Sequence, residues 1–166
     1  MEEKLFNCMQ SFIEYYLIYR ALKGKCSSSL EVDKNQFMVA VSDANLQMCF
    51  VLWCKIFGSE RNNKLHWKNF VSEEAFYERL IADYEISEED FAKFSGDMRE
   101  FRNKYVSHTD PYDEPVPYLK TAIYAVLVID ELMGKSESEV PFGTLASYLE
   151  VSLDKYEGII NNIIES

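Results

Sequence analysis

The stretch SEEDFAKFSGDMREFRNKYVSHTD, from Ser87 to Asp110, decides the fold predicted for this chain. Ser87 precedes three acidic residues, a pattern typical of a helix start, because the serine side chain caps backbone N–H groups and carboxylates favour the positive end of the helix dipole. The apolar side chains that follow recur at steps of three and four residues and share one helix face: Phe91, Phe94, Met98, Phe101 and Tyr105. The sequence therefore predicts an amphipathic helix that ends near Asp110-Pro111.

Helical periodicity extends outward from this stretch over most of the chain. The same spacing of apolar residues predicts further helices over residues 5–23, 33–57, 72–83, 118–133 and 141–164. We expect Asp33 and Ser72 to begin two of them, and the segment 118–133, which is apolar almost all round, to run through the centre. No strand-like alternation, repeat or linker is visible, so we predict an all-α, up-and-down bundle of about six helices in a single domain, residues 1–166.

Composition limits the classes of function. Hydrophobic residues make up 48% of the chain, which is enough for a large core, and the net charge is −11, from 28 acidic and 17 basic residues. A protein that coats nucleic acid is usually basic, because phosphate neutralisation supplies much of its affinity. The acidity argues against such broad binding and leaves room only for a local basic site, of which Arg99, Arg102, Lys104 and His108 are the candidate.

The four cysteines indicate a reducing compartment. Their spacing contains no CxxC pair, and three of them lie in apolar helical patterns, so we expect buried free thiols: Cys8, Cys26, Cys49 and Cys54. No signal peptide precedes the first helix, and the run from Ile123 to Met133 is too short to cross a bilayer. We therefore expect a cytoplasmic protein with no membrane contact. No residue spacing indicates a metal site or a cofactor.

Arg102 and His108 carry the chemistry that the predicted helix end offers. Arg is a permanent cation whose planar fork matches phosphate geometry, and His exchanges protons near neutrality. Together they form a minimal set for phosphodiester chemistry without metal. The alternative is that Arg102 extends into solvent and His108 is a cation at a helix C-terminus, where positive charge is favoured anyway.

The order Arg102-Asn103, then His108 after five intervening residues, resembles the signature of the HEPN superfamily, which consists of helical domains associated with nucleic acids in prokaryotic defence and toxin–antitoxin systems. The resemblance implies a metal-independent endoribonuclease, a toxin or defence effector, in which the ribose 2′-hydroxyl attacks the adjacent phosphorus. It implies that His108 is the general acid or base, that Arg102 stabilises phosphoryl charge and that Asn103 orients one of them. Arg99 and Lys104 are candidate substrate contacts, whereas the core stripe accounts for Tyr105.

A straight α-helix would place Arg102 and His108 roughly 120° apart around its axis and about 9 Å apart along it. Either the helix ends so that the imidazole swings back, or a second copy supplies the complementary group. HEPN domains typically dimerise about a two-fold axis, so the resemblance implies a homodimer that acts on RNA. The face with Ser95, Gly96 and Arg99 beside Arg102 fits such a contact.

Other readings stay open. The chain is alternatively a non-catalytic HEPN module that binds a nucleotide, RNA or a protein partner, for instance a nucleotidyltransferase-like antitoxin. The motif is otherwise a coincidence in a plain helical interaction protein. In the loop 59–70, His66 and Trp67 either guide substrate, with Trp67 stacked on a base, or anchor the loop to the core.

Overall fold

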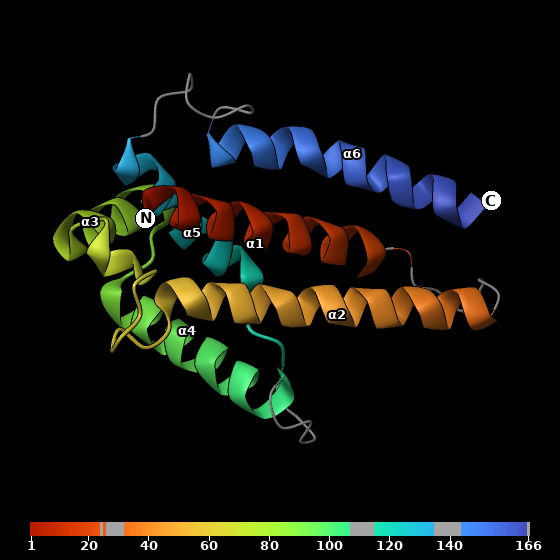
Figure 1. Ribbon diagram of the computed structural model, residues 1–166, viewed down its shortest axis with the longest axis horizontal. Helices are drawn as coiled ribbons and strands as arrows, with labels where there is room; N and C mark the ends of the chain where they lie inside the picture. Colours follow the sequence, from red (N-terminus) through yellow and green to blue (C-terminus); the bar gives the residue numbers. More distant parts are fainter. Residues whose placement is uncertain (24, 26–31, 107–114, 135–143, 166) are drawn as a thin grey trace.

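Six α-helices make up most of the part of the chain that the structure describes (Figure 1). The structure is a computed structural model and describes residues 1–23, 25, 32–106, 115–134 and 144–165. The α-helices are α1 (Glu2–Lys23), α2 (Val32–Phe57), α3 (Glu73–Tyr84), α4 (Glu88–Phe101), α5 (Leu119–Met133) and α6 (Leu145–Glu165), with a 3₁₀ turn η1 (Trp67–Asn69) and a π-helical turn η2 (Arg102–Val106). No strand occurs in these ranges, and the predicted all-α bundle of about six helices is confirmed.

The long helices lie side by side in the order α6, α1, α2 (Figure 1). α1 and α2 are antiparallel, and α6 runs in the same direction as α1. α4 and η2 pack against α2, on the side away from α1, while α5 contacts α1, α3 and α6. α2 therefore has a neighbour on two sides, which is the reason for its wide apolar face.

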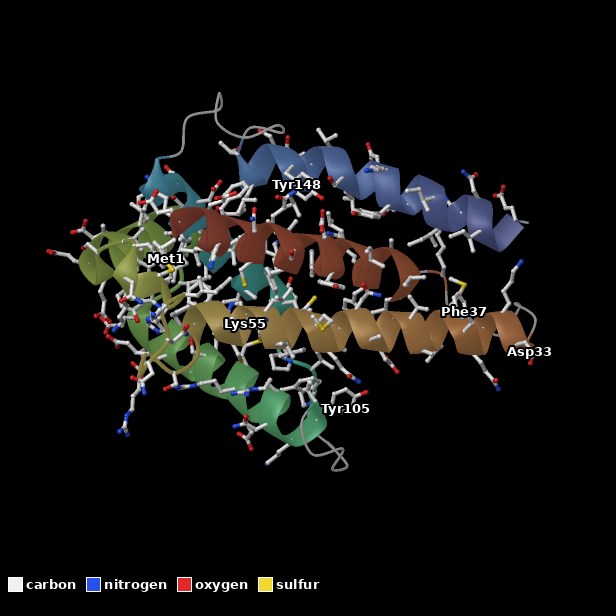
Figure 2. The ribbon with its side chains drawn as sticks, viewed as in Figure 1. Met1, Asp33, Phe37, Lys55, Tyr105 and Tyr148 are labelled. Atoms are coloured by element: carbon white, nitrogen blue, oxygen red, sulfur yellow. The ribbon has the colours of Figure 1, made fainter. Side chains whose placement is uncertain are left out.

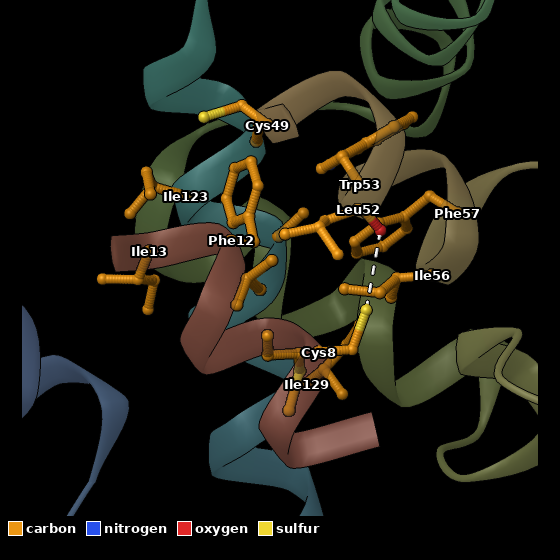
Figure 3. Packing of buried hydrophobic residues seen from close by; sticks show 14 of the residues in the cluster. Cys8, Phe12, Ile13, Cys49, Leu52, Trp53, Ile56, Phe57, Ile123 and Ile129 are labelled. Atoms are coloured by element: carbon orange, nitrogen blue, oxygen red, sulfur yellow. Dashed lines mark hydrogen bonds between the residues drawn. The ribbon is translucent and has the colours of Figure 1, made fainter. Parts of the chain in front are cut away.

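The core forms where α1, α2 and α5 meet (Figure 3). Phe12 of α1, Trp53 of α2 and Ile129 of α5 are fully excluded from solvent. Burying a side chain of this size stabilises the folded state by about 1.5–3 kcal/mol. The face of α5 that was predicted to be central is buried along its length: Leu119, Ala122, Ile123, Ala125, Val126, Val128 and Ile129.

Length and composition alone would allow the segment Asp33–Phe57 of α2 to cross a membrane. In the bundle, 44% of the most apolar 18-residue stretch of this segment is buried. A helix that packs between α1 and α4 also needs an apolar sequence of this kind. The apolar segment of α2 is longer than the run 123–133 in α5.

The described cysteines are free thiols, as predicted: Cys8, Cys49 and Cys54. Burial raises the pKa of the Cys8 and Cys49 thiols, so both stay protonated. The Cys8 thiol donates a hydrogen bond to the Leu52 carbonyl at 3.8 Å and joins α1 to α2 (Figure 3). Cys26 lies outside the described residues.

The predicted helix caps are confirmed at two of three positions. Ser72 Oγ accepts from the backbone N–H of Ala75 at 3.2 Å, and Ser87 Oγ accepts from that of Asp90 at 3.1 Å. The prediction for Asp33 is wrong, because α2 already includes Val32, so Asp33 lies in the first turn. Its carboxylate still favours the positive end of the helix dipole there.

Asp130 supplies a cap that the sequence does not reveal. α6 begins at Leu145, four residues after the predicted start at Pro141, which itself lies outside the described residues. The buried Asp130 of α5 accepts a hydrogen bond from the Leu145 N–H at 2.8 Å. α6 is also tied to α1, since the Tyr148 hydroxyl donates to Glu14 at 2.5 Å (Figure 2).

We predict that Asp130→Ala lowers the free energy of unfolding by about 1–3 kcal/mol, because it leaves a helix-terminal N–H without its acceptor and removes a buried polar contact. Urea unfolding followed by circular dichroism measures the change. Asp154→Ala, at an exposed position of α6, is the matched control and should change stability by less than about 0.5 kcal/mol. Equal stability of the two variants would contradict the assignment of Asp130 as a cap.

Candidate functional site

The predicted site starts where α4 changes its winding. α4 ends at Phe101, and the next five residues, Arg102 to Val106, form the π-helical turn η2. In this turn Arg102 is half-buried, whereas Asn103 and Lys104 are exposed. π-helical turns are rare and occur frequently at functional sites. The structure therefore places Arg102 at an irregular point of the backbone.

The π turn changes the geometry expected for Arg102 and His108. Their predicted separation assumed about 100° of rotation per residue in a straight α-helix. A π turn closes i→i+5 hydrogen bonds and is wider, so this rotation does not hold from Arg102 onward. His108 itself lies outside the described residues, and its approach to Arg102 stays a prediction.

The Arg102 guanidinium faces α2. Its side chain hydrogen-bonds the half-buried thiol of Cys54, and the charge of Arg99 also acts on that thiol. Burial raises the pKa of Cys54, and the two arginines only partly oppose this effect, so Cys54 stays a neutral thiol. The Arg102 guanidinium therefore contacts a neutral thiol and not a thiolate.

Arg99 lies one turn before Arg102 and lines a groove between α4 and the loop that follows α2. The groove has a volume of about 520 Å³ and brings Arg61 and Lys68 toward Arg99. The Arg99 Nε donates to the Ser95 carbonyl at 3.1 Å, which holds the side chain along the helix. We call this feature the α4 groove; Glu60 is its acidic member.

Ion pairs reduce the attraction of two lysines near the site for an anionic ligand. Lys68 Nζ lies 2.6 Å from Glu73 Oε1, and Lys104 Nζ lies 2.5 Å from Glu100 Oε1. The Glu100 carboxylate thus lies four residues before Lys104, on the same face of the helix. Of the two predicted substrate contacts, Arg99 is the one that the structure places at a groove.

His66 has a structural role in the loop. It is only 4% exposed, and its Nδ1 accepts from the Lys68 N–H at 3.4 Å as the cap of η1. Its ring also hydrogen-bonds the backbone of Gly58, which favours a proton on the other nitrogen. Both ring nitrogens are therefore engaged in holding the loop against the end of α2.

Gly58 is the residue that lets the loop leave α2. Its N–H donates to the Cys54 carbonyl at 3.0 Å, and a Cβ built on Gly58 would lie 2.2 Å from that same oxygen. No larger residue fits without a shift of the backbone. Gly58 lines the α4 groove, so the shape of the groove depends on this close approach of Gly58 to the Cys54 carbonyl.

Trp67 anchors the loop to the core, the second of the two roles considered for it. It is 3% exposed, and its ring centroid lies 4.3 Å from that of Phe76. A ring buried in this way does not offer a face to a nucleic-acid base. Among the described residues no group of three or more His, Cys, Asp or Glu side chains is placed to hold a metal ion.

The face proposed for a dimer is partly covered within the chain. Ser95 is buried, at 9% exposure, whereas Arg99 is exposed. A Cβ built on Gly96 would meet nothing within 4 Å, so the chain itself does not require a glycine there. The homodimer stays a prediction.

Comparisons with protein-family models, with curated proteins and with solved structures give no match. The resemblance to the HEPN superfamily therefore rests on the residues quoted for it. The contact between Arg102 and Cys54 was not predicted, because the 47 intervening positions leave no local signal. A cationic cleft between α1 and α5 was not predicted either, because its lining comes from two segments far apart in the sequence.

We predict that the imidazole of His66 titrates below its ordinary pKa of 6.5, because burial penalises the charged form more than nearby Glu60 favours it. An NMR pH titration of the two histidine rings, assigned with His66→Gln, measures it. Above pH 6.5 the ring is neutral in both the folded and the unfolded chain. As the pH falls through 6.5, the unfolded chain takes up the proton first, so folding stability declines. A midpoint at or above 6.5 would refute this.

Proposed function

We propose that this protein is an endoribonuclease that cleaves RNA without a metal, with Arg102 and His108 as its catalytic pair. The observation that carries the proposal is the π-helical turn that begins at Arg102 and leads toward His108. A helix that changes its winding at an arginine can direct the following chain back toward that side chain. In this proposal the π-helical turn positions the catalytic side chains.

The reaction needs charge stabilisation and two proton transfers. The 2′-hydroxyl oxygen bonds to phosphorus while the bond from phosphorus to the 5′ oxygen breaks, which leaves a 2′,3′-cyclic phosphate and a 5′-hydroxyl. In the proposal an imidazole removes the 2′ proton or protonates the leaving oxygen, the role of His108. Arg102 stabilises the charge that develops on the phosphoryl oxygens.

The half-buried position of Arg102 supports this role. A guanidinium that is partly removed from water interacts more strongly with an anion than an exposed one. The Cys54 thiol gives Arg102 a fixed neutral contact, so the cation is oriented without a formal opposite charge from that side chain. Asn103 is exposed on the same turn and would orient the phosphate or the imidazole.

Arg99 and the α4 groove would receive the RNA backbone beside the reacting phosphate. Arg61, Lys68 and Arg99 provide three positive charges against Glu60 and the Glu73 partner of Lys68. The balance is only weakly positive, so the groove would hold a short segment of a single strand. Lys104 contributes less, because Glu100 neutralises it.

A homodimer would complete the site in this proposal. Two copies of η2 related by a two-fold axis would place an Arg102 and a His108 from each chain around one cleft. The net charge of −11 opposes the approach of both RNA and a second copy. We therefore expect the dimer to be weakest at very low ionic strength, where the repulsion between two acidic copies is least screened.

The non-catalytic alternative has one observation in its favour. Lys104, next to the proposed catalytic residues, is bound to Glu100 and adds little attraction for phosphate. A module that binds RNA, a nucleotide or a nucleotidyltransferase-like antitoxin would need Arg102 but no proton transfer. It would bind the same ligands with His108 replaced.

We predict that the purified protein cleaves single-stranded RNA in EDTA and that His108→Ala lowers the rate about 100-fold to 10,000-fold, the range usual for loss of a general acid or base. Arg102→Ala should reduce cleavage comparably, with partial recovery in Arg102→Lys, because lysine keeps the charge and loses the planar fork. Gel analysis of a labelled RNA measures the rates and the cyclic phosphate end.

Lys93→Ala is the matched control, since Lys93 is exposed on α4 and lies outside the groove. Wild-type protein that binds RNA without cutting it would support the non-catalytic module. Equal cleavage by wild type and His108→Ala would eliminate the proposed mechanism.

A further inference from the structure

A second charged cleft lies between the C-terminal half of α1 and the first turn of α5. It has a volume of about 600 Å³, and its walls carry Arg20 and Lys23 from α1 and Tyr118 and Lys120 from the start of α5. We propose that this α1–α5 cleft binds a nucleotide unit of single-stranded RNA, with the cations on the phosphate and Tyr118 on the base. The choice of RNA rests on the proposed function; the cleft itself does not.

The described lining of the cleft is basic, although the chain as a whole is acidic. The chain has a net charge of −11, yet none of the described residues that line this cleft is acidic. Elsewhere in the described ranges Lys68, Arg79 and Lys104 form ion pairs with carboxylates. No described carboxylate pairs with Arg20, Lys23 or Lys120, so this is a local positive centre.

Aromatic rings hold two of these cations in place. Lys23 Nζ lies 5.4 Å from the centre of the Tyr19 ring, and Lys120 Nζ lies 5.4 Å from that of Tyr124. Contacts of this kind fix an ammonium group without neutralising it. A phosphate that enters the cleft would meet cations whose positions are already restricted.

The first turn of α5 adds to the attraction for an anion. Tyr118 is the N-cap residue and supplies no side-chain hydrogen bond to the turn. The backbone N–H groups at a helix start carry partial positive charge and lack partners within the helix. In the cleft they stand beside Lys120, so backbone and side chains favour the same kind of ligand.

Tyr118 distinguishes a nucleotide from a simple anion. Its side chain is 69% exposed, although it lies at the mouth of a cleft whose other walls include Tyr16 and Tyr19. An acidic peptide would need only the cations and would make no use of the exposed Tyr118 ring. An exposed ring beside phosphate-binding cations matches the arrangement by which proteins stack single-stranded bases.

The cleft stands close in the sequence to the proposed catalytic residues. Val116, on its wall, follows His108 by eight positions, and Lys120 lies just beyond. RNA held there would contact Val116, which is close to His108 along the chain. The cleft would thus anchor substrate without taking part in the reaction.

Binding can be tested apart from cleavage with a fluorescein-labelled 2′-O-methyl RNA 12-mer, because the blocked 2′ oxygen cannot attack phosphorus. Fluorescence anisotropy at several salt concentrations gives the dissociation constant. We expect Tyr118→Ala to weaken binding about tenfold, as loss of one stacked base does, with little change in Tyr118→Phe. Arg20→Ala and Lys120→Ala should each weaken binding and lower the salt slope by about 0.7.

Lys4→Ala is the matched control, because it removes the same charge from the exposed N-terminal end of α1, outside the cleft. It should bind the RNA within about twofold of wild type. Thermal unfolding of every variant shows that folding is intact. The proposal is overturned if wild type does not bind the RNA, if the cleft variants behave like Lys4→Ala, or if poly-glutamate competes as well as unlabelled RNA.

The outcome separates the two proposals. If the cleft variants bind poorly and wild type never cleaves unmodified RNA, the cleft is right and the catalytic assignment is wrong. If His108→Ala abolishes cleavage while Arg20→Ala and Tyr118→Ala bind and cleave like wild type, the reverse holds.

Discussion

A cluster of aromatic rings at the C-terminal end of α2 is the interaction on which the rest of the site depends. The Phe57 ring lies 6.2 Å from that of Trp67, 6.0 Å from Phe76 and 5.6 Å from Phe91. These contacts join the loop after α2 to α3 and α4. Aromatic pairs at such distances add about 0.5–1.5 kcal/mol each beyond the burial of their area. Because α4 is positioned by this cluster, the place of Arg99 and Arg102 is decided by packing.

Charge divides the surface into two kinds of region. Some described cations near α3 and α4 are paired with carboxylates, as Arg79 is with Glu131 and Asp83. Exposed pairs of this sort contribute little stability. Their consequence is electrostatic, since each pair cancels a positive charge, whereas none of the described residues that line the α1–α5 cleft is acidic. An anionic ligand would be attracted to that cleft more strongly than to the paired cations.

Local sequence patterns were enough to predict the helices and their main faces. The three- and four-residue spacing of Phe91, Met98 and Phe101 identified the buried face of α4, and Ser72 and Ser87 marked two helix starts, because these signals arise within one or two turns. Contacts between distant segments had no such signal. Asp130 caps a helix that begins 15 positions away, and Arg20 and Lys120, 100 positions apart, line the same cleft.

The π turn is the instructive failure of the periodic argument. Nothing in FRNKYV, residues 101–106, departs from a helix pattern: it contains no glycine or proline, and Tyr105 continues the apolar stripe. The Phe101 and Tyr105 rings still lie 4.9 Å apart, so the stripe is kept through the change of winding. The apolar stripe keeps the partly buried Tyr105 against the core. The π turn, however, spans one residue more per backbone hydrogen bond than an α-helical turn. The polar residues between Phe101 and Tyr105 must then move around the axis relative to an α-helix, and these are the residues to which the proposed chemistry is assigned.

A periodic pattern specifies which side chains are buried; it leaves the backbone free to accommodate them with either winding. The geometry of a site at a helix end is therefore decided by the packing of α4 and η2 on α2.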